Sequence, residues 1–266
     1  MATVEELKKE LFYKASNAGA VLCDDEINKA DAFAEGYKKF LNEAKTEREA
    51  TTVVLEKAKE KGFQEFVPGK KYEIGEKIYY VNRDKSIILA VIGKKSLKEG
   101  VKIAAAHIDS PRLDLKPNPL YESDEIALFK THYYGGIKKY QWVAIPLALH
   151  GVIVKADGSK VTVKIGEEEG EPKFVISDIL PHLGAEQGKR TLSEGIAGEE
   201  LNVIVGSRPF KSDEGSELRV ALLILVEVVA IEAWEVALHL NTCRELTCVV
   251  VNLEVVVRAE VATEAL

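Results

Sequence analysis

The sequence feature that most constrains the fold is an apolar run that ends in a histidine and a carboxylate. The run VKIAAAH, residues 101–107, is apolar on both faces when extended, because successive side chains of a strand alternate between the two faces of a sheet. This pattern is typical of a central strand in a sheet covered by helices. The strand would deliver His107 and Asp109 at its C-terminal end, where ligands gather in open α/β sheets. The run therefore predicts an α/β fold with a candidate site at this strand end.

Helical segments precede this run, and shorter strands lie between. Residues 4–12 and 24–41 carry apolar side chains at helical spacing, and a third helix is expected at about residues 51–61. The spacing of apolar residues is then no longer helical. Residues 77–82 and 86–92 are short runs rich in Ile, Val and Tyr, and glycines bound them. These two runs are expected to be strands.

A second, β-rich unit is expected at about residues 116–210, inserted after the strand that carries His107. It contains a hairpin pattern around Asp157 and Gly158. The run YYGG, residues 133–136, has the aromatic character of a base-stacking loop, but the acidic composition of the chain favours a strand or a turn.

The composition excludes several function classes. The chain has 43 acidic and 36 basic residues and a net charge of −7, so we expect no nucleic-acid partner. Its longest purely apolar stretch, residues 220–226, is far shorter than the ~20 residues that span a bilayer, and its N-terminus lacks the pattern of a secretion signal, so we expect no membrane partner. Three cysteines without a C-x-x-C pair favour a reducing, cytoplasmic location. Nucleotide-binding glycine motifs, H-E-x-x-H and G-x-S-x-G do not occur.

The last 55 residues, 212–266, differ abruptly from the rest. They contain 12 Val and a single Gly, but no Lys, Pro, Phe, Tyr, Gln or Met. One interpretation is a helix over residues 217–240 followed by a buried strand within CVVVNLEVVVRAE. The other is that this stretch is no authentic continuation, being frame-shifted, fused, truncated or misassigned. The sequence alone leaves both open.

The spacing of His107 and Asp109 suits metal binding. An imidazole can give one ring nitrogen to a divalent metal, while a carboxylate two residues later restrains the ring or binds the metal itself. A hydrogen-bonded pair without metal is the plainer alternative, and spacing alone does not decide between them.

Five separated blocks, in a constant order, carry a resemblance to a known family. They are AAHIDSPRLDLKPNPL, ALFKTHYYGGIKKYQW, IPLALHGVI, DILPHL and LSEGIAGEELN. Over residues 24–210 the chain resembles the aminopeptidase I and aspartyl aminopeptidase family of dinuclear zinc metallopeptidases. The resemblance implies a zinc-exopeptidase-like three-layer catalytic domain, with its first part at residues 1–115, interrupted by a β-rich lid and dimerisation domain at 116–210. Residues 211–266 then form an atypical tail.

The resemblance also implies roles for single residues. His107 is similar to the family's first zinc ligand, and Asp109 to the carboxylate that orients that ligand. His182, in the PHL block, is similar to a histidine that reaches the active site of a neighbouring subunit, although a solvated loop histidine is the alternative. The implied cofactor is Zn²⁺, two ions per full site, with Co²⁺ or Mn²⁺ able to substitute.

The family's remaining metal ligands and its general base cannot be read after Phe210. The adjacent Glu199 and Glu200 lie in lid-like sequence and are expected to be solvated. His239, with Glu232 and Glu235 at helical spacing, has no counterpart in the family blocks.

The expected function is a metal-dependent aminopeptidase that releases N-terminal amino acids from peptides with metal-activated water. The alternative is a catalytically incomplete fragment or assembly module of the same family, since one histidine cannot hold a catalytic zinc. Peptide substrates are expected, together with self-association through the lid, whose strand edges need pairing.

Overall fold

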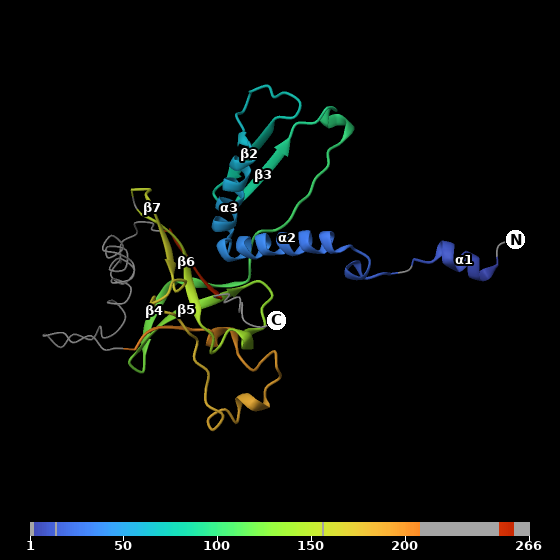
Figure 1. The fold of residues 1–266 in the computed structure, drawn as a ribbon. Helices are drawn as coiled ribbons and strands as arrows, with labels where there is room; N and C mark the ends of the chain where they lie inside the picture. The colour runs from blue at the N-terminus through green and yellow to red at the C-terminus, as the bar shows by residue number, and fades with distance from the viewer. Residues whose placement is uncertain (1–2, 14, 156, 208–249, 258–266) are drawn as a thin grey trace. The chain divides into compact units, whose positions relative to one another are not determined.

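The computed structural model describes residues 3–13, 15–155, 157–207 and 250–257 (Figure 1). The chain divides into two compact units, Met1–Ala44 and Lys45–Leu266. Each unit is described by itself below.

The first unit consists of helices α1 (Val4–Leu11) and α2 (Asp24–Glu43), with a short 3₁₀ turn, η1 (Ala18–Ala20), between them. Thr3 and Glu6 form a capping box that satisfies backbone N–H groups at the start of α1. Neither helix has a buried residue. The helices α1 and α2 confirm the two helices predicted for residues 4–12 and 24–41. Because neither has a buried residue, their apolar side chains are exposed in the described part of the chain.

The second unit begins with helix α3 (Glu47–Glu60) and a three-stranded sheet. The sheet order is β1 (Gln64–Glu65), β2 (Lys77–Asn82), β3 (Ser86–Val91), and β2 and β3 are antiparallel. The strands predicted at residues 77–82 and 86–92 are therefore confirmed. Helix α3 starts one turn earlier than predicted. The cause is a capping box in which the Thr46 hydroxyl accepts from the Glu49 N–H and the Glu49 carboxylate accepts from the Thr46 N–H.

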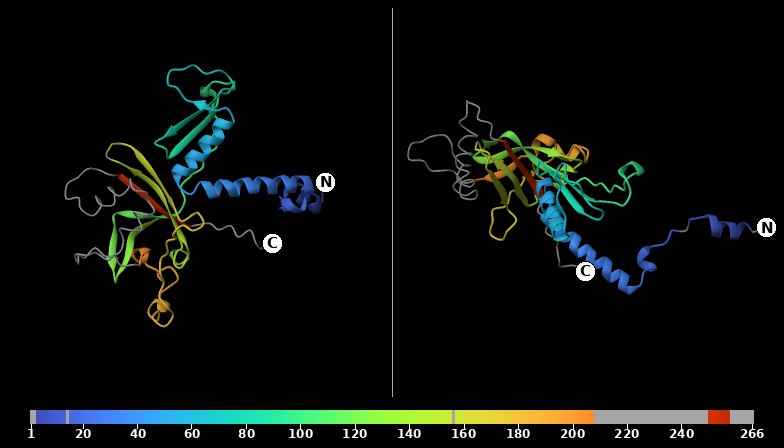
Figure 2. Two further views of the ribbon diagram at one scale, coloured as in Figure 1. Left: turned by 60° about the vertical axis from the view of Figure 1, so that its left-hand side comes forward. Right: turned by 90° about the horizontal axis from the view of Figure 1, so that it is seen from above.

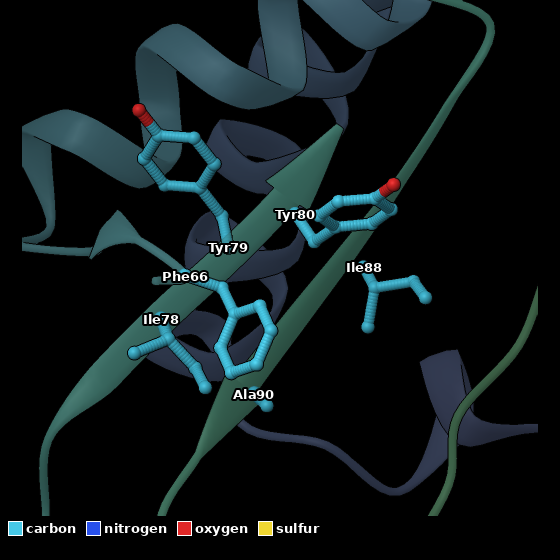
Figure 3. Close-up of a pocket in the computed structure, with 6 residues that line it drawn as sticks. All are labelled: Phe66, Ile78, Tyr79, Tyr80, Ile88 and Ala90. Atoms are coloured by element: carbon cyan, nitrogen blue, oxygen red, sulfur yellow. The ribbon is translucent and has the colours of Figure 1, made fainter. Parts of the chain in front are cut away.

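One part of this small sheet presents apolar side chains around an open hollow (Figure 3). Phe66 precedes β2, and strands β2 and β3 provide the other lining residues, Ile78, Tyr79, Tyr80, Ile88 and Ala90. Ile88 is 64% exposed and Tyr80 is 49% exposed. This surface will be called the β2–β3 apolar face.

The β-rich part of the second unit is a six-stranded sheet in the order β7-β6-β9-β4-β5-β8, and the pairs in it are antiparallel (Figures 1 and 2). The strands are β4 (Arg112–Ser123), β5 (Ile126–Tyr134), β6 (Leu147–Val154), β7 (Lys160–Ile165), β8 (Val203–Gly206) and β9 (Val250–Val257). Short 3₁₀ turns lie at η2 (Leu97–Glu99), η3 (Lys139–Gln141), η4 (Gln187–Lys189) and η5 (Gly198–Glu200). The hairpin predicted around residues 157–158 is confirmed as β6 and β7.

The core of the second unit is built mainly on this six-stranded sheet. The largest fully buried side chains include Leu113, Leu147, Leu149, Leu201 and Val203. Alternating residues of antiparallel strands place such side chains on one face of the sheet, which gives the β-rich part a hydrophobic core of its own.

Strand β9 lies between β6 and β4 and pairs with both. It falls within CVVVNLEVVVRAE, where one interpretation of the tail expected a strand. The helix expected at residues 217–240 lies outside the described residues.

The strand predicted at residues 101–106 is wrong. Residues 101–111 form no strand, and Val101 and Ile103 are 59% and 81% exposed. A central strand needs partners that bind its backbone on both edges. Within the described ranges no strand pairs with this run. His107 and Asp109 therefore lie in an extended connection between η2 and β4 rather than at the end of a sheet strand.

The mixture of helices and sheets agrees with the predicted α/β class. In the part of the chain that the structure describes, no helix has the length and apolar character that crossing a membrane requires.

Candidate metal centre

The structure brings His107 and Asp109 together. The Nδ1 atom of His107 lies 3.0 Å from Oδ1 of Asp109 and 3.1 Å from the Asp109 carbonyl oxygen. Both partners can only accept a hydrogen bond, so Nδ1 donates, and in the neutral imidazole Nε2 then keeps its lone pair. The His107 side chain is 83% exposed. This arrangement leaves Nε2 on the solvent side as a nitrogen able to bind a metal ion, while Asp109 sets the orientation of the ring.

A tyrosine holds the other oxygen of the same carboxylate. The hydroxyl of Tyr134, the last residue of β5, donates to Oδ2 of Asp109 at 3.0 Å. This bond is the main reason that the pKa of Asp109 lies below its ordinary value, and hydrogen bonding to His107 adds to it. The Asp109 carboxylate in turn raises the pKa of the Tyr134 hydroxyl. Asp109 is therefore held as a carboxylate between two donors.

Arg112 supports Tyr134 from the neighbouring strand. The two residues face each other in the β4–β5 register, and the guanidinium lies 4.0 Å from the centroid of the tyrosine ring. Arg112 is itself buried and fixed, because Nε donates to Asp114 at 2.8 Å and Nη1 lies 3.1 Å from Glu47. The contacts of Arg112 on β4 thus hold the ring of Tyr134 in place on β5, which fixes the position of the tyrosine hydroxyl.

Within the described residues, the donor set supports His107 as one zinc ligand. His107 has a free ring nitrogen and an orienting carboxylate, which is the arrangement found behind most zinc-binding histidines. A catalytic zinc usually needs three protein ligands. Among the described residues no group of three or more His, Cys, Asp or Glu side chains is placed to hold a metal ion.

The other predicted residues do not join this pair. His182 lies on an exposed turn after Pro181. Among the described residues no hydrogen bond or ion pair of its side chain is seen. Glu199 and Glu200 form surface ion pairs, with Lys116 at 2.7 Å and Arg190 at 3.2 Å, as expected for solvated groups. The cluster of His239, Glu232 and Glu235 falls outside the described residues.

A second histidine, His150 on β6, forms a buried charged cluster that sequence reasoning missed. Its ring is 1% exposed; Nδ1 lies 2.8 Å from Oε1 of Glu49 and Nε2 lies 2.9 Å from Oε1 of Glu167. Lys45 binds the same Glu167 oxygen at 2.6 Å. Burial alone would raise the pKa of both carboxylic acids, but hydrogen bonds from His150, Thr46 and Lys45 outweigh it, so both pKa values are lowered.

This cluster has no sequence signature, because Glu49 lies 101 positions from His150. Both ring nitrogens of His150 are engaged, so the cluster is structural rather than a site with a free ligand. It joins the start of helix α3 to the β-rich sheet.

Comparison with known proteins identifies the family of the chain. The family model described as "Aminopeptidase I zinc metalloprotease (M18)" matches residues 40–241. The chain belongs to the M18 aminopeptidase family. The match includes the His107–Asp109 pair and the β-rich sheet as far as β8.

Curated relatives of the chain are also named as M18 family aminopeptidases. A probable M18 family aminopeptidase 1 from Clostridium acetobutylicum is 45% identical over 212 residues, which is 78% of this chain and 46% of the relative. One from Borrelia garinii is 44% identical over 215 residues, 80% of this chain and 47% of the relative. This M18 chain therefore spans about half the length of the relatives it matches.

Solved M18 structures have the same fold over the shared part. Aminopeptidase I from Borrelia burgdorferi B31 matches with a TM-score of 0.73 and 35% identity, covering 92% of this chain and 53% of that one. The M18 aminopeptidase from Thermotoga maritima matches with a TM-score of 0.74 and 36% identity, covering 92% and 51%.

Proposed function

We propose that this M18 chain acts in the metal-dependent release of N-terminal amino acids from peptides, with Nε2 of His107 as a zinc ligand. The observation that carries the proposal is the His107–Asp109 pair, found in a member of a zinc aminopeptidase family. A bound zinc would supply Lewis-acid chemistry and an activated water. Asp109 keeps the imidazole in the tautomer whose Nε2 is free, and Tyr134 holds Asp109.

The finer parts of the proposal follow the family resemblance. A full site would hold two zinc ions, or Co²⁺ or Mn²⁺ in their place. His182 would act in catalysis at a neighbouring subunit, and its exposure on a turn is compatible with such reach. Residues 1–115 would be the first part of the catalytic domain and residues 116–210 the lid.

Self-association through the lid is proposed because the six-stranded sheet ends in two unpaired edges, β7 and β8, in the described part of the chain. A cytoplasmic location is supported by Cys23, which is exposed and not in a disulfide. Light scattering on the purified chain tests self-association, and a monomer at micromolar concentration would contradict it.

The function is tested by measuring amino acid release from short peptides with added Zn²⁺, with a chelator, and with two matched variants. His107→Ala is expected to abolish zinc-dependent activity because it removes a metal ligand. Glu199→Gln is expected to leave that activity unchanged because Glu199 forms an ion pair with Lys116 on the surface. Full activity of His107→Ala, or loss of activity in Glu199→Gln, would overturn the assignment.

A second candidate function is a catalytically incomplete assembly module of the same family. It is favoured by the single zinc ligand among the described residues and by coverage of about half of each relative. This candidate would be supported if the chain self-associates but shows no peptidase activity with Zn²⁺, Co²⁺ or Mn²⁺. Zinc-dependent turnover by the chain would exclude it.

A further inference from the structure

The hydroxyl of Tyr134 engages the oxygen of Asp109 that His107 leaves free. Asp109 Oδ1 faces Nδ1 of His107 at 3.0 Å, and Oδ2 faces the tyrosine hydroxyl at 3.0 Å. With one oxygen bonded to each neighbour, the carboxylate plane is fixed on both sides. The segment that carries His107 and Asp109 pairs with no strand in the described ranges, so side-chain bonds of this kind help to set its geometry.

Tyr134 has the rigidity that this task requires. It ends β5, directly opposite Arg112 at the start of β4, and the buried guanidinium packs on its ring. The next residue, Gly135, has a φ of 82°, in the left-handed region that favours glycine, so the chain turns away immediately after the tyrosine. The YYGG run thus ends a strand with its second tyrosine aimed at Asp109.

We propose that Tyr134 is a positioning residue of the metal site, which acts through Asp109 to hold His107 with Nε2 free. The inference rests on the proposed function only in that His107 binds metal. Tyr134 contacts neither metal nor substrate in this role. Its contribution is to keep the carboxylate, and hence the imidazole, in one orientation.

The neighbouring tyrosine provides a matched control. Tyr133 precedes Tyr134 on the same strand and is similarly exposed, but its ring stacks on His132 and no hydrogen bond joins it to Asp109 in the described residues. Tyr134→Phe removes only the hydroxyl and keeps the ring on Arg112, and Tyr133→Phe removes the same group one residue earlier.

The test uses the full 266-residue chain with ¹⁵N-labelled histidines, in which His107→Ala identifies the His107 signals among the five histidines. Ring-nitrogen spectra of the metal-free protein at about pH 8 report the tautomer. Titration with Zn²⁺ alone, followed at the same signals, gives the affinity at His107. Both are measured in wild type, Tyr134→Phe, Tyr133→Phe, Asp109→Ala and the Tyr134→Phe/Asp109→Ala double variant.

We expect Tyr134→Phe to raise the population of the Nε2–H tautomer and to weaken Zn²⁺ binding at His107 by roughly 3- to 10-fold, less than direct loss of an orienting carboxylate. In the Asp109→Ala background the same change should have no further effect, because the tyrosine acts through that carboxylate. Tyr133→Phe should match wild type.

Two results would overturn the inference: an unchanged tautomer and affinity in Tyr134→Phe, or an equal loss of affinity with and without Asp109. If wild-type His107 does not respond to Zn²⁺, the proposed function fails, while the tautomer populations of the metal-free variants still decide the role of Tyr134. A merely structural role is separated by thermal unfolding, which should be the same for Tyr134→Phe and Tyr133→Phe.

Discussion

His150 on strand β6 binds Glu49 on helix α3 across 101 positions of sequence, with Nδ1 and Oε1 2.8 Å apart. Its other nitrogen binds Glu167, so one buried ring satisfies two carboxylates. A second ion pair joins α3 to the same sheet, because Nη1 of Arg112 on β4 lies 3.1 Å from Glu47 on α3. The two pairs together link the start of α3 to the six-stranded sheet.

Replacement of His150 by Ala should lower the free energy of unfolding by about 3–5 kcal/mol, because two largely buried carboxylates lose their partner. Urea unfolding measures the change. Lys160→Ala is the control, since its ion pair with Asp84 is 55% exposed on each side and should contribute below about 1 kcal/mol. A loss in His150→Ala no larger than in the control would show that the cluster does not stabilise the link between α3 and the sheet.

The same cluster predicts a dependence of stability on acid. The pKa of Glu49 is lowered in the folded chain from its ordinary value of 4.5, because hydrogen bonds from His150 and Thr46 outweigh the effect of burial. The unfolded chain therefore binds the proton more readily, so the contribution of Glu49 is full above pH 4.5 and is lost as the pH falls through the lowered pKa. The difference in urea midpoint between wild type and Glu49→Gln should accordingly shrink as the pH falls below 4.5. A difference that grows in acid would contradict the lowered pKa.

The capping box of α3 gives a third prediction. Thr46→Ala removes the hydroxyl that accepts from the Glu49 N–H and should lower the free energy of unfolding by about 1 kcal/mol. Thr3→Ala removes the equivalent bond at the start of α1, a helix without buried residues, and should leave the global urea midpoint unchanged. Equal effects of the two variants would show that the stability of α3 does not depend on its packing in the second unit.

Strand β9 predicts a pattern of amide hydrogen exchange. It pairs with β6 from Leu147 to Val154 on one side and with β4 at Leu113 and Asp114 on the other. In a chain that ends at residue 207, the β6 amides that face β9 should lose protection, while amides between β5 and β8 should keep it. Unchanged protection of β6 would mean that the tail does not complete the sheet, which favours the interpretation of residues 212–266 as no authentic continuation.

Local patterns predicted most of the elements. The strand at Lys77–Asn82 has the predicted bounds, and α2 begins at the predicted acidic residue Asp24. Hairpin and cap signals of this kind lie within a few residues of the element they specify, so one sequence suffices. The sequence also contains the signal for the early start of α3, because Thr46 and Glu49 have the spacing of a capping box.

Long-range relationships could not be predicted in this way. The run VKIAAA has the composition of a central strand, yet a strand exists only where another strand binds its backbone. The pairing of His107 with Asp109 followed from spacing, whereas the support from Tyr134 depends on a β4–β5 register that brings residue 134 back beside residue 112. The His150 cluster similarly depends on three segments far apart in sequence.

The β2–β3 apolar face has a consequence for the calorimetry of this chain. Ile88, 64% exposed, and Tyr80, 49% exposed, are already hydrated when the chain is folded, so unfolding adds little new apolar surface there. An average globular chain of this length would show a heat capacity increase on unfolding of about 3–4 kcal/mol/K. This chain should show a smaller increase in heat capacity on unfolding. Its free energy of unfolding should therefore change less with temperature on either side of the temperature of maximum stability.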